Sequence, residues 1–578
     1  MKKTCIAMMA ALICAGAAVA QESNTWNPNL PNGTYRNPVI DADYSDPDVC
    51  RVGNDYYMTS SSFANFPGLQ ILHSTDLVNW KLIGAALQDD YPVLPEYRGT
   101  DLDWRKKIQH GNYVWAPAIR YHDGWFYIYW GDPDQGLFMV KTQDPAGTWS
   151  APVCVKEGKG MIDCCPLWDE DGKAYLSHGC AGSRAGVKSV LFVAPMSADG
   201  TRVLGPSRIV FDGHEDQPTI EGTKFYKRNG YYYIMSPAGG VKYGWQVILR
   251  SKNPFGPYEE YVGLAQGKSK VNGPHQGAWI DTPNGEDWFL HFQDKHAYGR
   301  VVHLQPAKWV NDWLVIGEDK DGDGCGDPVA TWKKPNLPSS GSVQPAEDDE
   351  FDSTALGFQW QFEGPYSHYW YFCDARHSKL RLYGIQQPEG YRNLADMQNT
   401  LMQKFPTENF TVTAKMRFIP NPNNKNKGEE AGFIIKGLDY AAIKFVSEAD
   451  GCKMRFVTCI GAQKGKAEQV MAELPIELKA LDKPYTQKYA VDDIPQPRLA
   501  TPEIYVRAVV KSSGICNDIK STAQFYYSFD GKKFQKIGEP YTVKEGKWIG
   551  AKVGFFNCRS TVSNDAAFLD IDWIRFEK

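Results

Sequence analysis

A hairpin-like stretch that recurs through the first 300 residues constrains the fold of this chain most strongly. Its clearest copy is EGTKFYKRNGYYYIMS, residues 221–236, where Asn229-Gly230 is a strong turn signal between two strand-like runs. Other copies begin at Trp115, Asp163 and Gln276 and, more loosely, at Asp46. Apart from the loose copy, each has a glycine nine residues after its first residue. The repeat predicts paired strands, copy after copy.

The spacing of the copies predicts how the hairpins are assembled. Paired strands that repeat every 50 to 70 residues or so are typical of a propeller, whose blades have about four strands around a central channel. Five copies predict five blades. If each copy begins with the innermost strand, the leading residues ring one mouth of the channel: Asp46, Trp115, Asp163, Glu221 and the His275-Gln276 pair.

Length and composition bound the remaining possibilities. A chain of 578 residues exceeds a single core and predicts two or three domains. The net charge of −5 gives no basic field, so we expect no nucleic-acid partner. Aromatic residues make up 13% of the chain, which suits an all-β protein that stacks on flat apolar faces such as sugar rings.

The N-terminus has the layout of a secretory signal. Lys2-Lys3, an apolar run and Ala18-Val19-Ala20 predict a cleaved signal peptide over residues 1–20, and hence an exported protein, periplasmic or extracellular. Cys14 offers a lipoprotein alternative, which the bulky Ile13 before it disfavours. No later segment is apolar enough to predict a membrane span. The polar stretch 21–36 is expected to be loosely ordered.

A Pro/Ser/Gly-rich stretch from Pro335 marks a domain boundary. We therefore predict the propeller over residues 37–334 and, from alternating strand-like runs, a β-sandwich over residues 346–578. Eleven cysteines follow the signal without metal-ligand spacing. Mostly free, buried thiols with one or two bridges are expected rather than a disulfide framework.

Several motifs together resemble glycoside hydrolase family 43. They are Ser45-Asp46-Pro47-Asp48, Trp115-Ala116-Pro117, Asp163 ahead of Asp169-Glu170-Asp171-Gly172, Glu221-Gly222 and Gly299-Arg300. The resemblance implies a five-bladed propeller followed by a concanavalin-like sandwich. It implies Asp46 as general base, Asp163 as the acid that orients and tunes its neighbour, and Glu221 as general acid. Cys164-Cys165, where Pro-Ser is frequent in the family, puts the local strand geometry in question.

Each of the three acids also has a structural interpretation. Asp46 precedes Pro47 and could nucleate a turn, and Asp163 could satisfy backbone amides at the mouth of a blade. Glu221 lies on an otherwise apolar and aromatic strand, where an acid without a function would be costly. Because three crowded acids raise one another's pKa, one can remain protonated near neutral pH and act as proton donor.

Four further residues are candidates for binding. Phe66 and Trp115 could line the sugar site or pack in the core. For Arg300 the resemblance implies contact with a substrate hydroxyl, and the alternative is an ion pair within the fold. For His275 it implies an approach to a central metal ion through water, and the alternative is an interior histidine.

No cofactor is expected to be required, but one loop has calcium-like spacing. Residues 319–324, DKDGDG, offer oxygen ligands like the start of a calcium loop, so a structural Ca²⁺ is a candidate. The distal glutamate of an EF-hand is missing, which favours a solvated acidic turn.

Together these features predict an inverting exo-glycoside hydrolase that acts on plant cell-wall oligosaccharides. We expect it to release β-D-xylose from xylan-type chains; the first alternative is an α-L-arabinofuranosidase, and the second is a non-catalytic glycan-binding propeller. Asp46 leads the first blade and Glu221 the fourth, two steps apart around the ring. That placement favours the roughly 6.5 to 9.5 Å separation of an inverting pair over the roughly 5 Å of a retaining pair.

Overall fold

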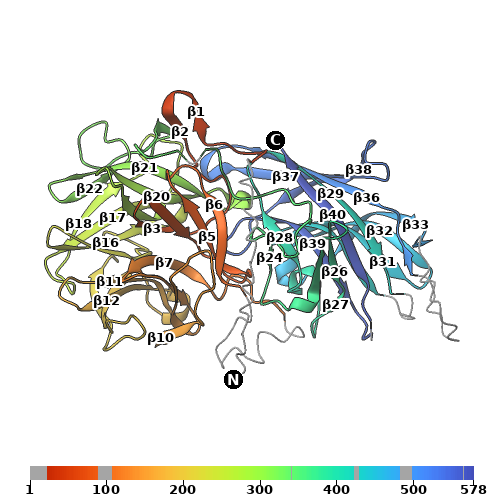
Figure 1. Cartoon of the computed structure of the whole chain (residues 1–578), viewed down its shortest axis with the longest axis horizontal. Helices are drawn as coiled ribbons and strands as arrows, with labels where there is room; N and C mark the ends of the chain where they lie inside the picture. Colours follow the sequence, from red (N-terminus) through yellow and green to blue (C-terminus); the bar gives the residue numbers. More distant parts are fainter. Residues whose placement is uncertain (1–22, 89–106, 340, 422–427, 482–497, 564) are drawn as a thin grey trace, which may run out of the picture.

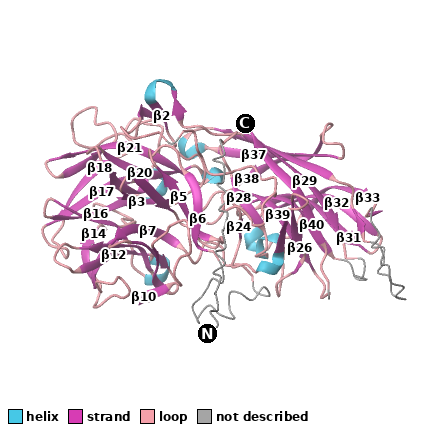
Figure 2. Cartoon of the chain, in the orientation of Figure 1, coloured by secondary structure: helices cyan, strands magenta, loops and turns pink. Residues whose placement is uncertain are grey.

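A computed structural model describes residues 23–88, 107–339, 341–421, 428–481, 498–563 and 565–578. The predicted signal peptide lies outside these residues. Strands dominate the described chain and helices are short (Figure 2), which confirms the prediction of an all-β protein. Within that part, no helix is long and apolar enough to cross a membrane.

In the described part of the chain, the N-terminal unit is built from five four-stranded antiparallel sheets (Figure 1). Their strands, in chain order, are β3 (Asp48–Val52), β4 (Asp55–Thr59), β5 (Gly68–Ser74), β6 (Lys81–Leu87); β7 (Trp115–His122), β8 (Trp125–Asp132), β9 (Gly136–Thr142), β10 (Val153–Glu157); β11 (Met161–Trp168), β12 (Ala174–Cys180), β13 (Val190–Met196), β14 (Arg208–Asp212); β15 (Lys224–Arg228), β16 (Tyr231–Ala238), β17 (Trp245–Ser251), β18 (Glu259–Leu264); β19 (His275–Asp281), β20 (Asp287–Asp294), β21 (Arg300–Val310), β22 (Trp313–Ile316). Every sheet follows the order of the chain, strand beside strand.

The sheets follow one another around a closed series of contacts. β3 contacts β7 and β19, β7 contacts β11, and β11 contacts β15, while β16 contacts β19. Each sheet begins with the recurring hairpin, and in the clearest copy Asn229 and Gly230 have φ of 50° and 73°. These left-handed values are those of a type I′ turn, which matches the twist of the flanking strands.

The segment after the predicted signal is more ordered than we expected from its composition. β1 (Asn29–Leu30), the short η1 (Pro31–Gly33) and β2 (Thr34–Arg36) precede the first sheet, and β2 pairs with β23 (Thr331–Lys333). Glu347 accepts a hydrogen bond from the Thr25 hydroxyl at 2.7 Å. The expectation of a loose segment over 21–36 was therefore wrong for residues 23–36, because partners about 300 residues later satisfy this backbone.

The C-terminal unit consists of two large sheets in the described part of the chain. One runs β24 (Gln361–Phe362), β28 (Leu401–Lys404), β39 (Lys552–Arg559), β30 (Glu429–Lys436), β31 (Tyr440–Glu448), β32 (Gly451–Cys459), β33 (Gln469–Ile476), with β27 (Ile385–Gln386) also beside β39. The other runs β25 (Tyr371–Asp374), β26 (Lys379–Tyr383), β40 (Phe568–Glu577), β29 (Phe410–Ile419), β36 (Ile504–Ser513), β37 (Lys520–Ser528), β38 (Gln535–Val543). The pair β34 (Lys479–Ala480) and β35 (Leu499–Ala500) lies apart.

Side chains from both large sheets meet in one apolar core. The ring centroids of Phe433 on β30 and Phe525 on β37 lie 6.3 Å apart, and Phe418 on β29 stacks on Phe445 of β31 at 6.0 Å. Alternating apolar residues along each strand supply this shared layer, as expected for a sandwich. The short helices are α1 (Gly182–Ala185), α2 (Gly240–Tyr243), η2 (His296–Tyr298), η3 (His368–Trp370), η4 (Leu394–Asp396), η5 (Ala462–Lys464) and η6 (Cys516–Asp518).

The two units pack closely where Asp43 lies between them. Its carboxylate accepts the backbone N–H of Arg300 at 2.8 Å and that of Gly550, from the sandwich, at 3.1 Å. A Cβ atom at Gly299 would lie 2.5 Å from the Asp43 side chain, and one at Gly550 would lie 2.8 Å from the Gly299 nitrogen. Glycine at both positions allows this backbone approach.

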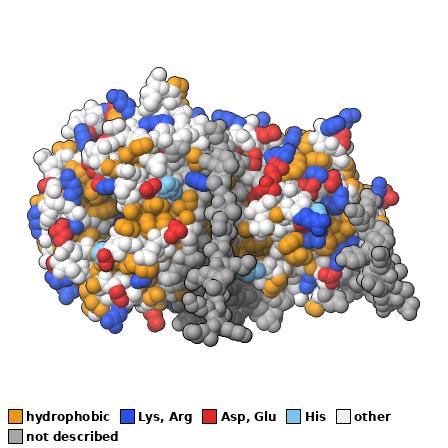
Figure 3. Space-filling model, in the orientation of Figure 1, with side chains coloured by type: hydrophobic (Ala, Val, Ile, Leu, Met, Phe, Trp, Pro, Cys, Tyr) orange, Lys and Arg blue, Asp and Glu red, His pale blue; other side chains and the backbone are white. Residues whose placement is uncertain are grey.

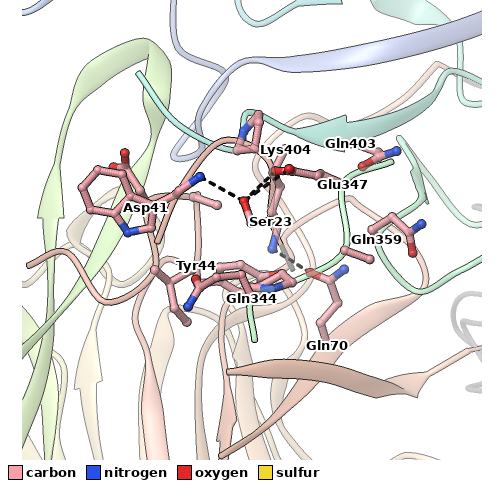
Figure 4. A pocket seen from close by; sticks show the side chains of 15 residues that line it. Ser23, Asp41, Tyr44, Gln70, Gln344, Glu347, Gln359, Gln403 and Lys404 are labelled. Carbon is pink, nitrogen blue, oxygen red and sulfur yellow. Dashed lines mark hydrogen bonds between the residues drawn. The ribbon is translucent and has the colours of Figure 1, made fainter. Parts of the chain in front are cut away.

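A small cavity of about 40 Å³ lies where the N-terminal segment, the first sheet and the sandwich meet (Figure 4). Lys404 donates to Gln70 Oε1 at 2.6 Å, and its Nζ lies 3.5 Å from the centroid of the Tyr44 ring. Burial lowers the pKa of Lys404 to about 7. These contacts join the two units away from the ring of predicted catalytic residues.

The cysteines agree with the main expectation for them. All eleven cysteines of the described residues are free thiols, so the expected predominance of free thiols is confirmed there, while the one or two expected bridges are not found among these residues. Acidic and basic side chains are interspersed on the visible face, without an extended area of one sign (Figure 3).

Candidate active site

The residues that lead the five sheets share an unusual backbone conformation. At or next to each predicted leading position stands a residue with positive φ: Asp46 (55°), Ala116 (24°), Asp163 (60°), Gly222 (67°) and Gln276 (38°). Register shifts accompany three of them, in β7, β11 and β19. Bulges and left-handed residues re-aim side chains and are common at functional sites. The repeat thus turns this row of side chains away from the regular strand direction.

Three donors face the carboxylate of Asp46. The hydroxyls of Ser45 and Ser61 donate to Oδ2 at 2.7 and 2.5 Å, and Nη1 of Arg300 lies 3.2 Å from Oδ1. The backbone N–H of Ala116 donates to Ser61 Oγ at 2.7 Å, which leaves the Ser61 proton for Asp46. Because an ionised carboxylate only accepts hydrogen bonds, these surroundings suit Asp46 as a proton acceptor.

Asp163 fixes the backbone next to Glu221, in the segment that leads into β15. Its Oδ2 accepts the backbone N–H of Gly222 at 2.7 Å, and its backbone oxygen accepts the Thr223 hydroxyl at 2.7 Å. A Cβ atom at Gly222 would lie 2.7 Å from Pro237, so the turn after Glu221 requires glycine. Asp163 therefore bonds backbone amides, as its structural interpretation holds, while standing next to the candidate proton donor.

Burial and the neighbouring negative charges raise the pKa of both Glu221 and Asp163. Burial raises the pKa of Glu221 to about 8, and the charges of Asp163 and Asp46 add to the rise. Burial also raises the pKa of Asp163 to about 7, with a further contribution from Asp46. The Glu221 side chain is packed by protein on most sides yet keeps 37% of its surface exposed. A ligand can therefore reach a carboxyl group that holds its proton at neutral pH.

A cleft of about 250 Å³ opens beside Arg300 at the junction of the two units. The sandwich supplies part of its wall, including Trp548, which is 44% exposed. The ring centroid of Trp548 lies 6.0 Å from that of Trp115, and the Trp115 ring lies 6.1 Å from Phe63. Trp115 is half-buried at this rim, and the sequence reasoning had singled out neither Phe63 nor Trp548.

Arg300 has the ion pairs that its structural interpretation predicts. Besides its contacts with Asp46 and Ser45, Nε lies 3.6 Å from Asp294 Oδ2, and the guanidinium lies over the Phe292 ring at 4.8 Å. The same side chain borders the cleft. Both assignments of Arg300 are thus compatible with its position.

Phe66 lies in the core, one of the two positions that the sequence left open for it. Only 1% of it is exposed, and its ring packs against Tyr113 at 6.2 Å within a core cluster. Its backbone pairs with that of Phe362 in the sandwich, with N···O distances of 2.9 and 2.7 Å. This burial agrees with the core alternative for Phe66, and its assignment to substrate binding stays a prediction that this position disfavours. Phe63, three residues earlier, lies beside Trp115 instead.

His275 is buried near Glu221. Its Nε2 lies 4.0 Å from Glu221 Oε1, and neither ring nitrogen has a hydrogen-bond partner among the described residues. Burial lowers the pKa of His275 to about 3, so the ring is neutral. A neutral imidazole with free nitrogens fits an ion approached through water, as the resemblance implied.

The acidic loop of residues 319–324 stands apart from these residues. Ligand oxygens of Asp319, Asp321 and Asp323 lie within 4.8 Å of one another, the one such group in the described part of the chain. Asp319 accepts backbone N–H groups from Gly322 and Gly324 at 2.7 and 3.1 Å. The loop therefore satisfies its own backbone, as a solvated acidic turn does.

Comparisons with known proteins match both units. The family described as Glycosyl hydrolases family 43 matches residues 35–314, and that described as Beta xylosidase C-terminal Concanavalin A-like domain matches residues 348–577.

Individual relatives cover most of the chain. A beta-xylosidase of Formosa agariphila is 30% identical over 96% of this chain and 92% of its own length. A non-reducing end alpha-L-arabinofuranosidase of Bacteroides ovatus is 34% identical over 72% of this chain and 75% of its own length. The crystal structure of a family 43 protein from Bacillus licheniformis superposes with a TM-score of 0.73 at 27% identity, covering 94% and 99% of the two chains.

Proposed function

Because the chain belongs to glycosyl hydrolases family 43, we propose that it removes single β-D-xylose units from the non-reducing ends of xylan-type oligosaccharides, with inversion. The family resemblance is confirmed, and the chain is a glycoside hydrolase. One observation carries the proposed chemistry: Glu221 has a raised pKa, while the Asp46 carboxylate accepts hydrogen bonds from Ser45 and Ser61. One acid is thus prepared to give a proton and the other to take one.

Glu221 acts as the general acid in this proposal. Its proton, retained at neutral pH, goes to the glycosidic oxygen as the bond to the anomeric carbon breaks. Asp163 assists without touching the sugar, because its charge raises the pKa of Glu221 and its bond to Gly222 holds the strand in place.

Asp46 acts as the general base. It takes a proton from a water molecule, whose oxygen attacks the anomeric carbon from the face opposite the leaving group. Ser45, Ser61 and Arg300 hold the carboxylate in place through its two oxygens. This single displacement inverts the anomeric configuration and forms no covalent sugar-enzyme intermediate.

The substrate is proposed from the relatives and from the cleft. The two named relatives act, by their names, as a beta-xylosidase and as an alpha-L-arabinofuranosidase. α-L-Arabinofuranosidase therefore stays the alternative activity. Sandwich residues around Trp548 line the same cleft as Arg300, which supports a walled, exo-acting pocket over an open groove. A plant cell-wall oligosaccharide is the proposed partner.

The finer features of architecture and location are proposals as well. The five sheets and their closed series of contacts support a five-bladed propeller with the site at one mouth of its channel. The family match over 348–577 supports the concanavalin-like sandwich. Residues 1–20 support export to the periplasm or outside the cell.

Glu221 and Asp46 supply both proton transfers of the proposed reaction, so the proposal needs no cofactor. A structural Ca²⁺ at Asp319, Asp321 and Asp323 is a secondary proposal, and so is an ion held through water near His275.

Hydrolysis of aryl β-D-xyloside and aryl α-L-arabinofuranoside, followed by product analysis on xylo-oligosaccharides, tests the proposal. We expect the larger kcat/KM on the xyloside and release of xylose alone from the non-reducing end. A larger kcat/KM on the arabinofuranoside would select the alternative activity. No pentose release from any substrate would favour a glycan-binding protein without catalysis.

A further inference from the structure

An open cleft of about 600 Å³ lies on the sandwich, away from the candidate active site. It forms where the chain crosses from β26 in one sheet to β27 in the other, near the lower edge of the sandwich in Figure 1. None of the residues that line it lines the cleft beside Arg300. Its volume is within the range of small-molecule sites, about 300 to 1,000 Å³.

Aromatic rings form one side of this sandwich cleft. Tyr369, Tyr371, Phe372 and Tyr383 all line it, and Tyr369 and Phe372 are 63% and 52% exposed. Phe372 lies on β25, an edge strand of its sheet. Large rings held in water beside a concave surface provide flat apolar faces on which sugar rings can stack.

Polar groups complete the lining. Nη1 of Arg559 donates to the Gly384 carbonyl at 2.6 Å, while its Nε is buried without a partner among the described residues. Asp565 pairs with Arg498, and the Ser563 hydroxyl donates to the Asp565 carbonyl at 2.6 Å. Arg559 and Asp565 are the charged members of the lining, one of each sign. The cleft therefore matches an uncharged ligand rich in hydroxyl groups.

We propose that this cleft is a second glycan-binding site, which takes a short stretch of neutral polysaccharide outside the catalytic pocket. Sugar rings stack on Tyr369 and Phe372, and hydroxyl groups bond Arg559 and Asp565. The choice of xylan as ligand rests on the proposed function. A chain held here raises the effective concentration of its ends near the catalytic pocket of the same molecule.

Electrophoresis of the full chain through gels that contain xylan tests the site directly. A Glu221→Gln background keeps the gel polysaccharide intact. We expect clear retardation of this parent and an apparent Kd at least about tenfold weaker after Tyr369→Ala with Phe372→Ala, a loss of about 1.4 kcal/mol. Phe529→Ala is the matched control, because Phe529 is 47% exposed on the same sandwich and does not line the cleft.

Kinetics in the active background separate this site from the catalytic one. The Tyr369 and Phe372 double variant is expected to keep its kcat/KM on aryl xyloside and to lose rate on polymeric xylan. An unretarded parent, or equal retardation of parent and variant, would overturn the glycan site. So would a dimer, seen by light scattering, that the double variant abolishes, since a second copy would then occupy the cleft. If the enzyme with Glu221 intact hydrolysed no aryl pentoside, the proposed function would be contradicted. The gel experiment would still show whether the sandwich cleft binds glycan.

Discussion

Replacing Asp163 with asparagine should move the alkaline limit of activity to lower pH. The asparagine side chain would remain able to accept the Gly222 N–H, so the backbone next to Glu221 keeps this hydrogen bond. What disappears is a negative charge that helps to raise the pKa of Glu221 to about 8. Two unit charges about 5 Å apart in an effective dielectric constant of about 20 repel by about 3 kcal/mol, or roughly two pKa units, which sets the upper scale of the effect. Since 37% of the Glu221 side chain meets solvent, screening reduces the expected shift to about one unit.

The direction of the expected pH shift follows from the role of the Glu221 proton. Activity requires protonated Glu221, so kcat/KM falls as pH rises through its pKa, and a lower pKa moves that fall to lower pH. With nitrophenyl xyloside as substrate, kcat/KM of the parent enzyme should fall near pH 8, and this alkaline limb of the pH profile should move to about pH 7 in Asp163→Asn. A dinitrophenyl xyloside, whose leaving group needs little protonation, should show a weaker limb in both enzymes. A limb that stays in place, or rises, would refute the assignment of Asp163 as the residue that tunes Glu221.

Three further results are expected. Asp46→Asn and Glu221→Gln should each lower kcat by about 10²-fold or more, and good aryl leaving groups should rescue Glu221→Gln alone; near-normal turnover in either variant would remove its assignment. A chain ending near Pro335 should be poorly soluble or inactive, because it exposes the surface that the sandwich covers, whereas a soluble and fully active fragment would show the sandwich to be independent. Trp548→Ala should raise KM for xylo-oligosaccharides with little change in melting temperature, since its ring is 44% exposed at the rim; an unchanged KM would exclude Trp548 from binding.

Local sequence patterns predicted much of the fold and the positions of the three candidate catalytic acids. The turn glycines and strand alternation repeat in register, so the sequence alone aligned Asp46, Asp163 and Glu221 as leading residues of the first, third and fourth copies. Those three side chains act on one another in the structure. The same alignment marked the positions where positive φ recurs.

Contacts between segments far apart in the sequence could not be predicted from these local patterns. Phe66 has an aromatic ring of the kind that stacks on sugars. Its backbone pairs with that of Phe362, about 300 residues later, and the residue is buried. Trp548 stands in a turn whose only signal is an aromatic residue among Gly, Lys and Ile, and its place beside Trp115 depends on how the two units pack. The support of Asp46 by Ser61 likewise depends on a backbone amide from the next sheet.

Proton NMR during hydrolysis of a β-xyloside tests the central claim of this account most directly. A single displacement, with Asp46 activating water and Glu221 donating the proton, predicts α-xylose as the first product, before mutarotation yields the β form. Early appearance of β-xylose, or a fluorosugar trapped on Asp46, would show a covalent intermediate and contradict the mechanism.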